Sequence, residues 1–278
     1  MPTPPPPKPV HDPPPSAFDS NDTDPTSVQF GDSISHIDQW GAADLPLLPI
    51  PVDTHWMLAA EACNSWTESS AVSPTVSIGR LAVPGKASGE YQKGCGALKD
   101  KKYDEAEKHE RSAIQLYPDY AAAWVVLGQT LESENKRDDG EKACSQARAV
   151  DPNYVAPYLC LADLAASQEN WKEVSTLSAS ALTLDPTGNA YSFYYAADAA
   201  FHLGDLPKAE KDAQNSVKLD KWRHLAQVHL LLAQIDKMKG DSAGQAAQLH
   251  EYLKIAGNSP EASGVKGTLT HIENKPSQ

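Results

Sequence analysis

The sequence predicts an all-α repeat protein, and two observations carry this prediction. Three prolines, Pro118, Pro152 and Pro186, follow one another at a constant spacing of 34 residues, and an amphipathic segment follows each of them. Compact residues also recur at two fixed places in this period, where they let two helices touch closely. They are Ala106, Gly140 and Val174 at the first place and Ala113, Ala147 and Ala181 at the second. Because one such unit cannot bury its apolar face alone, the units must stack on one another.

The clearest unit runs from Ala121 to Tyr154 and reads AAAWVVLGQTLESENKRDDGEKACSQARAVDPNY. Its landmark positions hold Trp124, Leu127, Gly128, Leu131, Gly140, Cys144, Ala147 and Pro152. This pattern resembles the tetratricopeptide repeat family, and wordings such as DPNYVAPYLCLADLAA are similar to those of its bacterial members. The resemblance implies a right-handed superhelical solenoid of helix-turn-helix pairs, in which the first helix of each pair lines a concave groove.

Alignment on the prolines divides the repetitive part of the chain, 87–257, into five units. They are 87–120, 121–154, 155–188, 190–223 and 224–257. The first is less regular than the others, which suits a terminal unit, and the fifth has drifted furthest from the pattern. Beyond the fifth, the run Ser259-Pro260-Glu261 is a helix-start signal, with a capping serine followed by a proline and an acid. It predicts a C-terminal capping helix at 260–273.

The N-terminal part of the chain has a different composition. Residues 1–70 hold 13 of the 22 prolines and carry ten Asp and Glu against one Lys, so most of the net charge of −13 lies there. Such a segment favours extended polyproline II and cannot bury enough apolar surface to offset its ordering entropy. Residues 1–45 are therefore predicted to be a disordered, acidic, proline-rich tail. The tail serves as a spacer or, alternatively, as a ligand for a proline-binding domain.

Residues 46–86 are predicted to be a partly ordered connector with one short helix. The stretch THWMLAAEACNSW at 54–66 places Trp56, Ala59, Ala60, Cys63 and Trp66 on one helical face, which suggests a helix that docks on the first repeat. The alternative is that the connector is only partly ordered and does not dock.

Nothing in the sequence predicts catalysis. The nine histidines are scattered, and the HExxH, CxxC and EF-hand patterns are absent. Gly94-Cys95-Gly96 looks like the start of a phosphate loop, but no Lys-Ser or Lys-Thr follows it. No run of apolar residues approaches the length of a membrane span. No stripe of basic residues could bind the phosphates of a nucleic acid. We therefore expect no catalytic residue, no metal, no cofactor, no direct membrane insertion and no nucleic-acid partner.

The family resemblance names residues for the groove. They are Tyr91 and Lys99 in the first unit, Gln129 and Glu132 in the second, Asp163 in the third, and Tyr191, Tyr194, Asp198, Phe201 and His202 in the fourth. Aromatic rings beside carboxylates suit an extended peptide with basic and apolar side chains. Tyr191 is expected to be exposed, whereas Tyr194 and Phe201 could instead pack against neighbouring helices. The chaperone-binding members of the family grip a carboxylate with a Lys/Asn/Arg clamp, but Asp163 and Asp198 would repel one.

The favoured function is a non-catalytic scaffold that binds a protein or peptide partner in the groove. Two alternatives stay open: an assembly or secretion factor of the bacterial envelope, and an accessory domain of an enzyme. Fold alone cannot choose between them, because function lies in sites and not in folds. The sequence leaves the compartment open as well. A periplasmic or secreted location follows if the N-terminus is trimmed or the cysteines are bridged, and a cytoplasmic location follows otherwise.

The four cysteines suggest two pairs. Cys144 lies on the second helix of one unit and Cys160 on the first helix of the next, and these helices are neighbours in a stack. Cys63 lies on the apolar face of the predicted docking helix, and Cys95 lies where that helix would pack. The expected bridges are therefore Cys144–Cys160 and Cys63–Cys95, against the alternative that all four are reduced core thiols.

Overall fold

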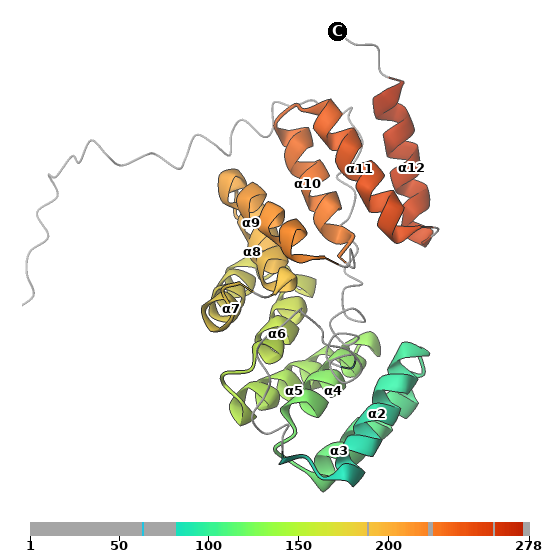
Figure 1. The fold of residues 1–278 in the computed structure, drawn as a ribbon, viewed down its shortest axis with the longest axis vertical. Coiled ribbons are helices and arrows are strands. Elements are labelled where there is room, and N and C mark those ends of the chain that lie inside the picture. Colours follow the sequence, from blue (N-terminus) through green and yellow to red (C-terminus); the bar gives the residue numbers. More distant parts are fainter. Residues whose placement is uncertain (1–62, 64–81, 188, 222–224, 258, 275–278) are drawn as a thin grey trace, which may run out of the picture. The chain divides into compact units, whose positions relative to one another are not determined.

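A computed structural model describes residue 63 and residues 82–187, 189–221, 225–257 and 259–274, which all belong to one compact unit. This described part consists of eleven α-helices without a strand (Figure 1). The helices are α2 (Gly85–Lys99), α3 (Tyr103–Leu116), α4 (Ala121–Ser133), α5 (Arg137–Val150), α6 (Val155–Ser167), α7 (Trp171–Leu184), α8 (Ala190–His202), α9 (Leu206–Leu219), α10 (Gln227–Met238), α11 (Ser242–Ala256) and α12 (Pro260–Glu273). The proposed tail at 1–45 and most of the proposed connector lie outside the described residues.

The first ten helices form five antiparallel pairs, one for each unit of the sequence. The first helices of the pairs, α2, α4, α6, α8 and α10, each contact the next first helix, so we call them the inner helices. Their partners, the outer helices α3, α5, α7, α9 and α11, make no such contact with one another within the described part of the chain. Burial follows this division. All but two of the thirteen residues of α4 are buried, but only four of the fourteen in α5.

Each pair turns through one residue in the left-handed backbone region. These residues are Lys101 (φ 58°), Asn135 (φ 63°), Glu169 (φ 56°), Gly204 (φ 85°) and Gly240 (φ 75°). In every turn, the next amide N–H donates to a carbonyl five residues earlier, as Lys136 N does to Leu131 O at 2.8 Å and Asp205 N to Ala200 O at 2.8 Å. This bond satisfies a carbonyl that the helix end would leave unpaired. The turn geometry is therefore common to all five units, although only two of them use glycine.

Two of the three landmark prolines connect successive units through their carbonyl groups. Trp124 Nε1 donates a hydrogen bond to Pro118 O at 2.9 Å, and Tyr158 Oη donates to Pro152 O at the same distance. Both donors lie one turn into an inner helix, and both acceptors close the preceding unit. The same contact therefore recurs after 34 residues, because each aromatic donor bonds its helix to the proline that ends the preceding unit.

Compact residues let the two helices of a unit approach closely. The six compact landmark residues at the two fixed places of the period are all buried. One close approach joins Gly128 in α4 to Gly140 in α5: a Cβ atom at Gly140 would lie 2.9 Å from the Gly128 carbonyl oxygen. A side chain at either position would therefore force these helices apart.

The last helices form a second apolar cluster. Leu230 of α10, Leu249 of α11, and Val265 and Leu269 of α12 are buried together in it. The hydroxyl oxygen of Ser259 accepts a hydrogen bond from Ala262 N at 3.3 Å, which caps the start of α12. The helix thus covers the apolar face that α11 would otherwise present.

Two disulfide bonds join elements that are separate in the chain. Cys63 is bonded to Cys95 in α2, with the two Cα atoms 5.6 Å apart. Cys144 in α5 is bonded to Cys160 in α6, with a Cα separation of 6.0 Å. The second bond connects one unit covalently to the next.

Candidate partner-binding surface

Most of the residues that the sequence assigns to the groove are buried. Lys99 and His202 are exposed, whereas the other eight lie in the interior. These eight are Tyr91, Gln129, Glu132, Asp163, Tyr191, Tyr194, Asp198 and Phe201. The expectation that Tyr191 is exposed is wrong, since only 3% of its surface is accessible. The inner helices lie against one another, and this contact buries side chains that helical register alone would place on an open face.

The buried acids and tyrosines form one cluster across α6 and α8. Tyr195 Oη donates a hydrogen bond to Asp163 Oδ1 at 2.6 Å, which joins the two inner helices. Burial, reinforced by the carboxylates of Asp198 and Asp163, raises the pKa of the Tyr194 hydroxyl well above its usual range. This tyrosine therefore stays protonated and able to donate a hydrogen bond. The sequence placed Asp163, Tyr194 and Asp198 in one groove but did not identify Tyr195 as the link.

The cluster reaches solvent at one edge, formed by Trp171, Asp198, Phe201 and His202, which we call the α7–α8 edge. The rings of Trp171 and His202 are stacked, with centroids 3.7 Å apart and planes at 5°. His202 Nε2 lies 3.5 Å from Asp198 Oδ1, and its side chain is 34% exposed. Phe201 meets the same imidazole edge-on, at 5.4 Å between centroids. Stacked aromatic rings beside a carboxylate can bind a cationic or apolar side chain of a partner.

Trp171 is a member of this edge that sequence reasoning missed. It is the first residue of an outer helix, so the register of the inner helices does not reach it. The tryptophan itself was the signal, because a partly buried tryptophan at a helix start has to pack on a neighbouring element. Here that neighbour is His202, the last residue of α8.

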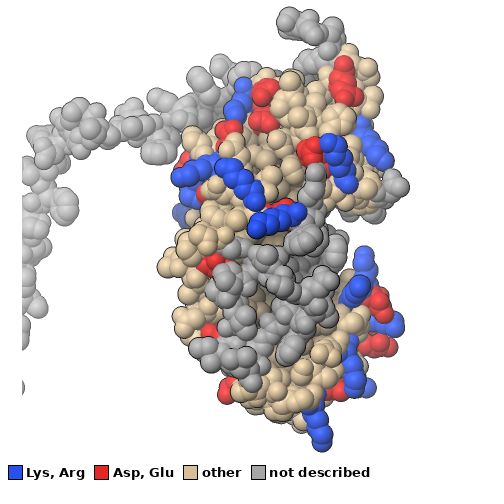
Figure 2. All heavy atoms as spheres, in the orientation of Figure 1, with Lys and Arg blue, Asp and Glu red and all other residues tan. Residues whose placement is uncertain are grey.

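Some charged side chains elsewhere on the surface form ion pairs between neighbouring units. Figure 2 shows lysines and arginines interspersed with acids over the helices in view, not gathered in one stripe. Two pairs join neighbouring units in the same way: Lys136 Nζ lies 2.7 Å from Glu107 Oε2, and Lys239 Nζ lies 2.8 Å from Glu210 Oε1. The hydrogen bond from Lys136 is the main reason that the pKa of Glu107 is lowered to about 2. These pairs strengthen contacts between units and suggest no site.

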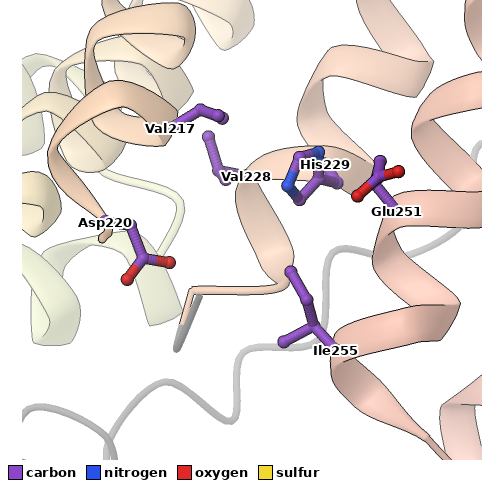
Figure 3. A pocket seen from close by; sticks show the side chains of 6 residues that line it. All are labelled: Val217, Asp220, Val228, His229, Glu251 and Ile255. Carbon is purple, nitrogen blue, oxygen red and sulfur yellow. The ribbon is translucent and has the colours of Figure 1, made fainter. Parts of the chain in front are cut away.

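A small cavity of about 220 Å³ lies where α9, α10 and α11 meet (Figure 3). Its walls combine aliphatic side chains with Asp220, His229 and Glu251. The polar groups are engaged already: Asp220 Oδ2 accepts a hydrogen bond from Leu225 N at 2.8 Å, and His229 Nδ1 lies 2.8 Å from Gln248 Oε1. Its size would suit one side chain or a small molecule, but no arrangement for a reaction is evident in it.

One buried carboxyl stands apart from these surfaces. Glu110 of α3 is fully buried beside Gly94 of α2, and neither of its oxygens has a hydrogen-bond partner among the described residues. Burial raises the pKa of this carboxyl well above its usual range, because the interior disfavours its charged form. Within the same described part of the chain, no group of His, Cys, Asp and Glu side chains could hold a metal ion, and no helix is long and apolar enough to span a membrane.

Comparison with known proteins agrees with this architecture. Residues 97–161 match the family model described as tetratricopeptide repeat. Residues 97–161 are thus tetratricopeptide repeat sequence, and the described helix pairs share the fold of that family. This repeat protein resembles a solved thermophilic member from Thermus thermophilus, with a TM-score of 0.55 and 16% identity over 67% of this chain and 98% of that one.

Two further solved structures share the fold. One is PilF of Pseudomonas aeruginosa, with a TM-score of 0.57 and 16% identity, covering 70% of this repeat protein and 90% of that chain. The other is PilW, described as a type IV pilus biogenesis factor, with a TM-score of 0.56 and 17% identity, covering 70% and 96%. No curated protein matches the sequence. At these identities the likeness concerns the fold alone.

Proposed function

We propose that this repeat protein is a non-catalytic scaffold that binds a protein or peptide partner at the α7–α8 edge and the inner helices behind it. The observation that carries the proposal is the α7–α8 edge itself. It presents the stacked rings of Trp171 and His202 next to the buried carboxylate of Asp198. Tetratricopeptide repeats mediate protein–protein interaction in general, and this edge supplies the accessible contact that such an interaction needs.

The chemistry of the edge indicates the kind of partner. Asp198 makes it acidic, and Trp171 and Phe201 make it aromatic. An extended segment with basic and apolar side chains complements both properties, because its cations offset the acid and lie against ring faces. A partner carboxylate would be repelled at the same place.

A binding assay with two matched peptides tests the proposal. A labelled peptide of alternating Lys and Leu should bind the full chain in fluorescence anisotropy, and a peptide of alternating Glu and Leu should not. The double variant Asp163→Asn/Asp198→Asn should weaken binding of the Lys peptide and flatten its salt dependence. Circular dichroism should show unchanged helical content.

The control is Asp138→Asn/Asp139→Asn, which removes the same charge from the exposed start of outer helix α5. This control should leave binding and its salt dependence as in the wild type. If the control variant loses binding while the inner variant keeps it, the partner uses the outer helices and the assignment of the α7–α8 edge is wrong.

A role as an accessory factor of the bacterial envelope is a second candidate, and the two disulfides favour it. Disulfides persist in oxidising compartments such as the periplasm and are rare in the cytosol. Expression with and without export separates the two cases: the envelope role requires the exported protein to hold both bonds and to bind its partner. A partner bound only by the reduced cytosolic form would overturn it.

A further inference from the structure

The two disulfides differ in their access to solvent. Cys144 and Cys160 are 0% and 1% exposed, and both sulfurs lie against the position that a Cβ atom would take at Gly128. Cys63 and Cys95 are only partly buried, at the edge of the core. Exchange of a disulfide needs a thiolate to reach one of its sulfurs, so access decides which bond reacts.

The surroundings of Cys95 add to this difference. Its neighbour Gly96 is exposed, and no atom of the described residues lies within 4 Å of the place where a Cβ would stand. A protein that attacks the bond must bring its own backbone close to the sulfur, and a residue without a side chain leaves room for that approach. Gly128, next to the other bond, is buried between two helices and offers no such room.

We propose that Cys63–Cys95 is a site of thiol–disulfide exchange with a dithiol oxidoreductase of the thioredoxin class, and that Cys144–Cys160 is a permanent structural bond. This inference goes beyond the scaffold function and does not depend on it. The exchangeable bond ties Cys63 to the inner helix α2, so its cleavage would release Cys63 from that helix.

The exchange is balanced within the two proteins. One thiolate of the oxidoreductase bonds to one sulfur of the Cys63–Cys95 pair, and the other sulfur leaves as a thiolate that takes up a proton. The second thiol of the oxidoreductase, as its thiolate, then attacks the mixed disulfide and releases the remaining cysteine. The chain gains two electrons and two protons, and the oxidoreductase loses them as its dithiol becomes a disulfide. The reverse sequence forms the bond.

Graded reduction tests the proposal on the full, oxidised chain. The protein is incubated with reduced bacterial thioredoxin, its free thiols are alkylated, and the labelled cysteines are identified by peptide mass spectrometry. Cys63 and Cys95 should be labelled at least tenfold faster than Cys144 and Cys160. A thioredoxin that lacks its second, resolving cysteine should be trapped as a mixed disulfide with Cys63 or Cys95.

The variant Cys63→Ser/Cys95→Ser serves as the matched control, and its circular dichroism reports whether it folds. It should trap no thioredoxin and should keep the other bond oxidised under the same conditions. Equal labelling of all four cysteines, earlier labelling of Cys144 and Cys160, or four free thiols before any reductant is added would each overturn the proposal.

Discussion

Replacement of Gly128 by alanine tests how closely α4 and α5 pack. The new Cβ atom would lie 3.1 Å from the carbonyl oxygen of Gly140 and 3.3 Å from Cys160 Sγ, and it would meet Cys144 Sγ more closely still. The two sulfurs are bonded to each other and the oxygen belongs to the backbone, so none of these atoms can yield easily. Overpacking of this kind costs about 1–3 kcal/mol of the free energy of unfolding.

The same substitution at Gly96 supplies the matched control. Gly96 lies inside α2 and its Cβ position is open, so Gly96→Ala gains only the helix propensity of alanine, about 1 kcal/mol. Because Gly128→Ala gains the same propensity, the difference between the two variants isolates the packing cost of about 1–3 kcal/mol. At about 2–4 °C for each kcal/mol in a chain of this size, the variants should melt several degrees apart, with Gly128→Ala lower. Equal melting temperatures by circular dichroism would refute the close packing of α4 and α5.

Three further predictions concern other positions. For Glu110→Gln, the melting temperature of the wild type relative to that of the variant should fall as pH rises above 4.5. The reason is that the raised pKa makes the folded state hold a proton that the unfolded state releases. A constant difference in melting temperature between pH 4 and 8 would contradict the raised pKa of the buried carboxyl. Glu169→Gly should raise the urea midpoint of unfolding, and Gly204→Ala should lower it. The reason is that relief of the left-handed backbone strain, about 1–2 kcal/mol, exceeds the entropy cost of glycine, about 0.5–1 kcal/mol. The opposite order of midpoints would show that the turns are not strained. Cys144→Ala/Cys160→Ala should lower the free energy of unfolding by about 3 kcal/mol, as expected for the loss of a bond that closes a loop of about 15 residues. A urea unfolding curve of the variant that matches that of the oxidised wild type would show that the bond does not form.

Much of the fold could be predicted because its determinants are local. The spacing of Pro118 and Pro152 marks the links between units, and both prolines accept a hydrogen bond from an aromatic residue of the next helix. The turns within the units were harder to anticipate. Lys101 and Glu169 adopt a left-handed conformation that a sequence signals only when glycine or asparagine occupies the position.

The candidate site could be predicted only in part, because register gives the direction of a side chain but not the distance to the next helix. Asp163, Tyr194 and Asp198 do lie together, as their common register implies. Tyr191 is buried because neighbouring inner helices contact one another, a property of the packing between units. Trp171 belongs to an outer helix, so the register of the inner helices could not predict its place in the site.

The central claim is that a partner binds at the α7–α8 edge, and hydrogen-exchange mass spectrometry of the full chain tests it most directly. Exchange is compared with and without the peptide of alternating Lys and Leu. The account predicts slower exchange in the start of α7 and the end of α8, around Trp171 and His202, with the outer helices α3 and α5 unchanged. Protection confined to α3 and α5, or no protection anywhere, would contradict it.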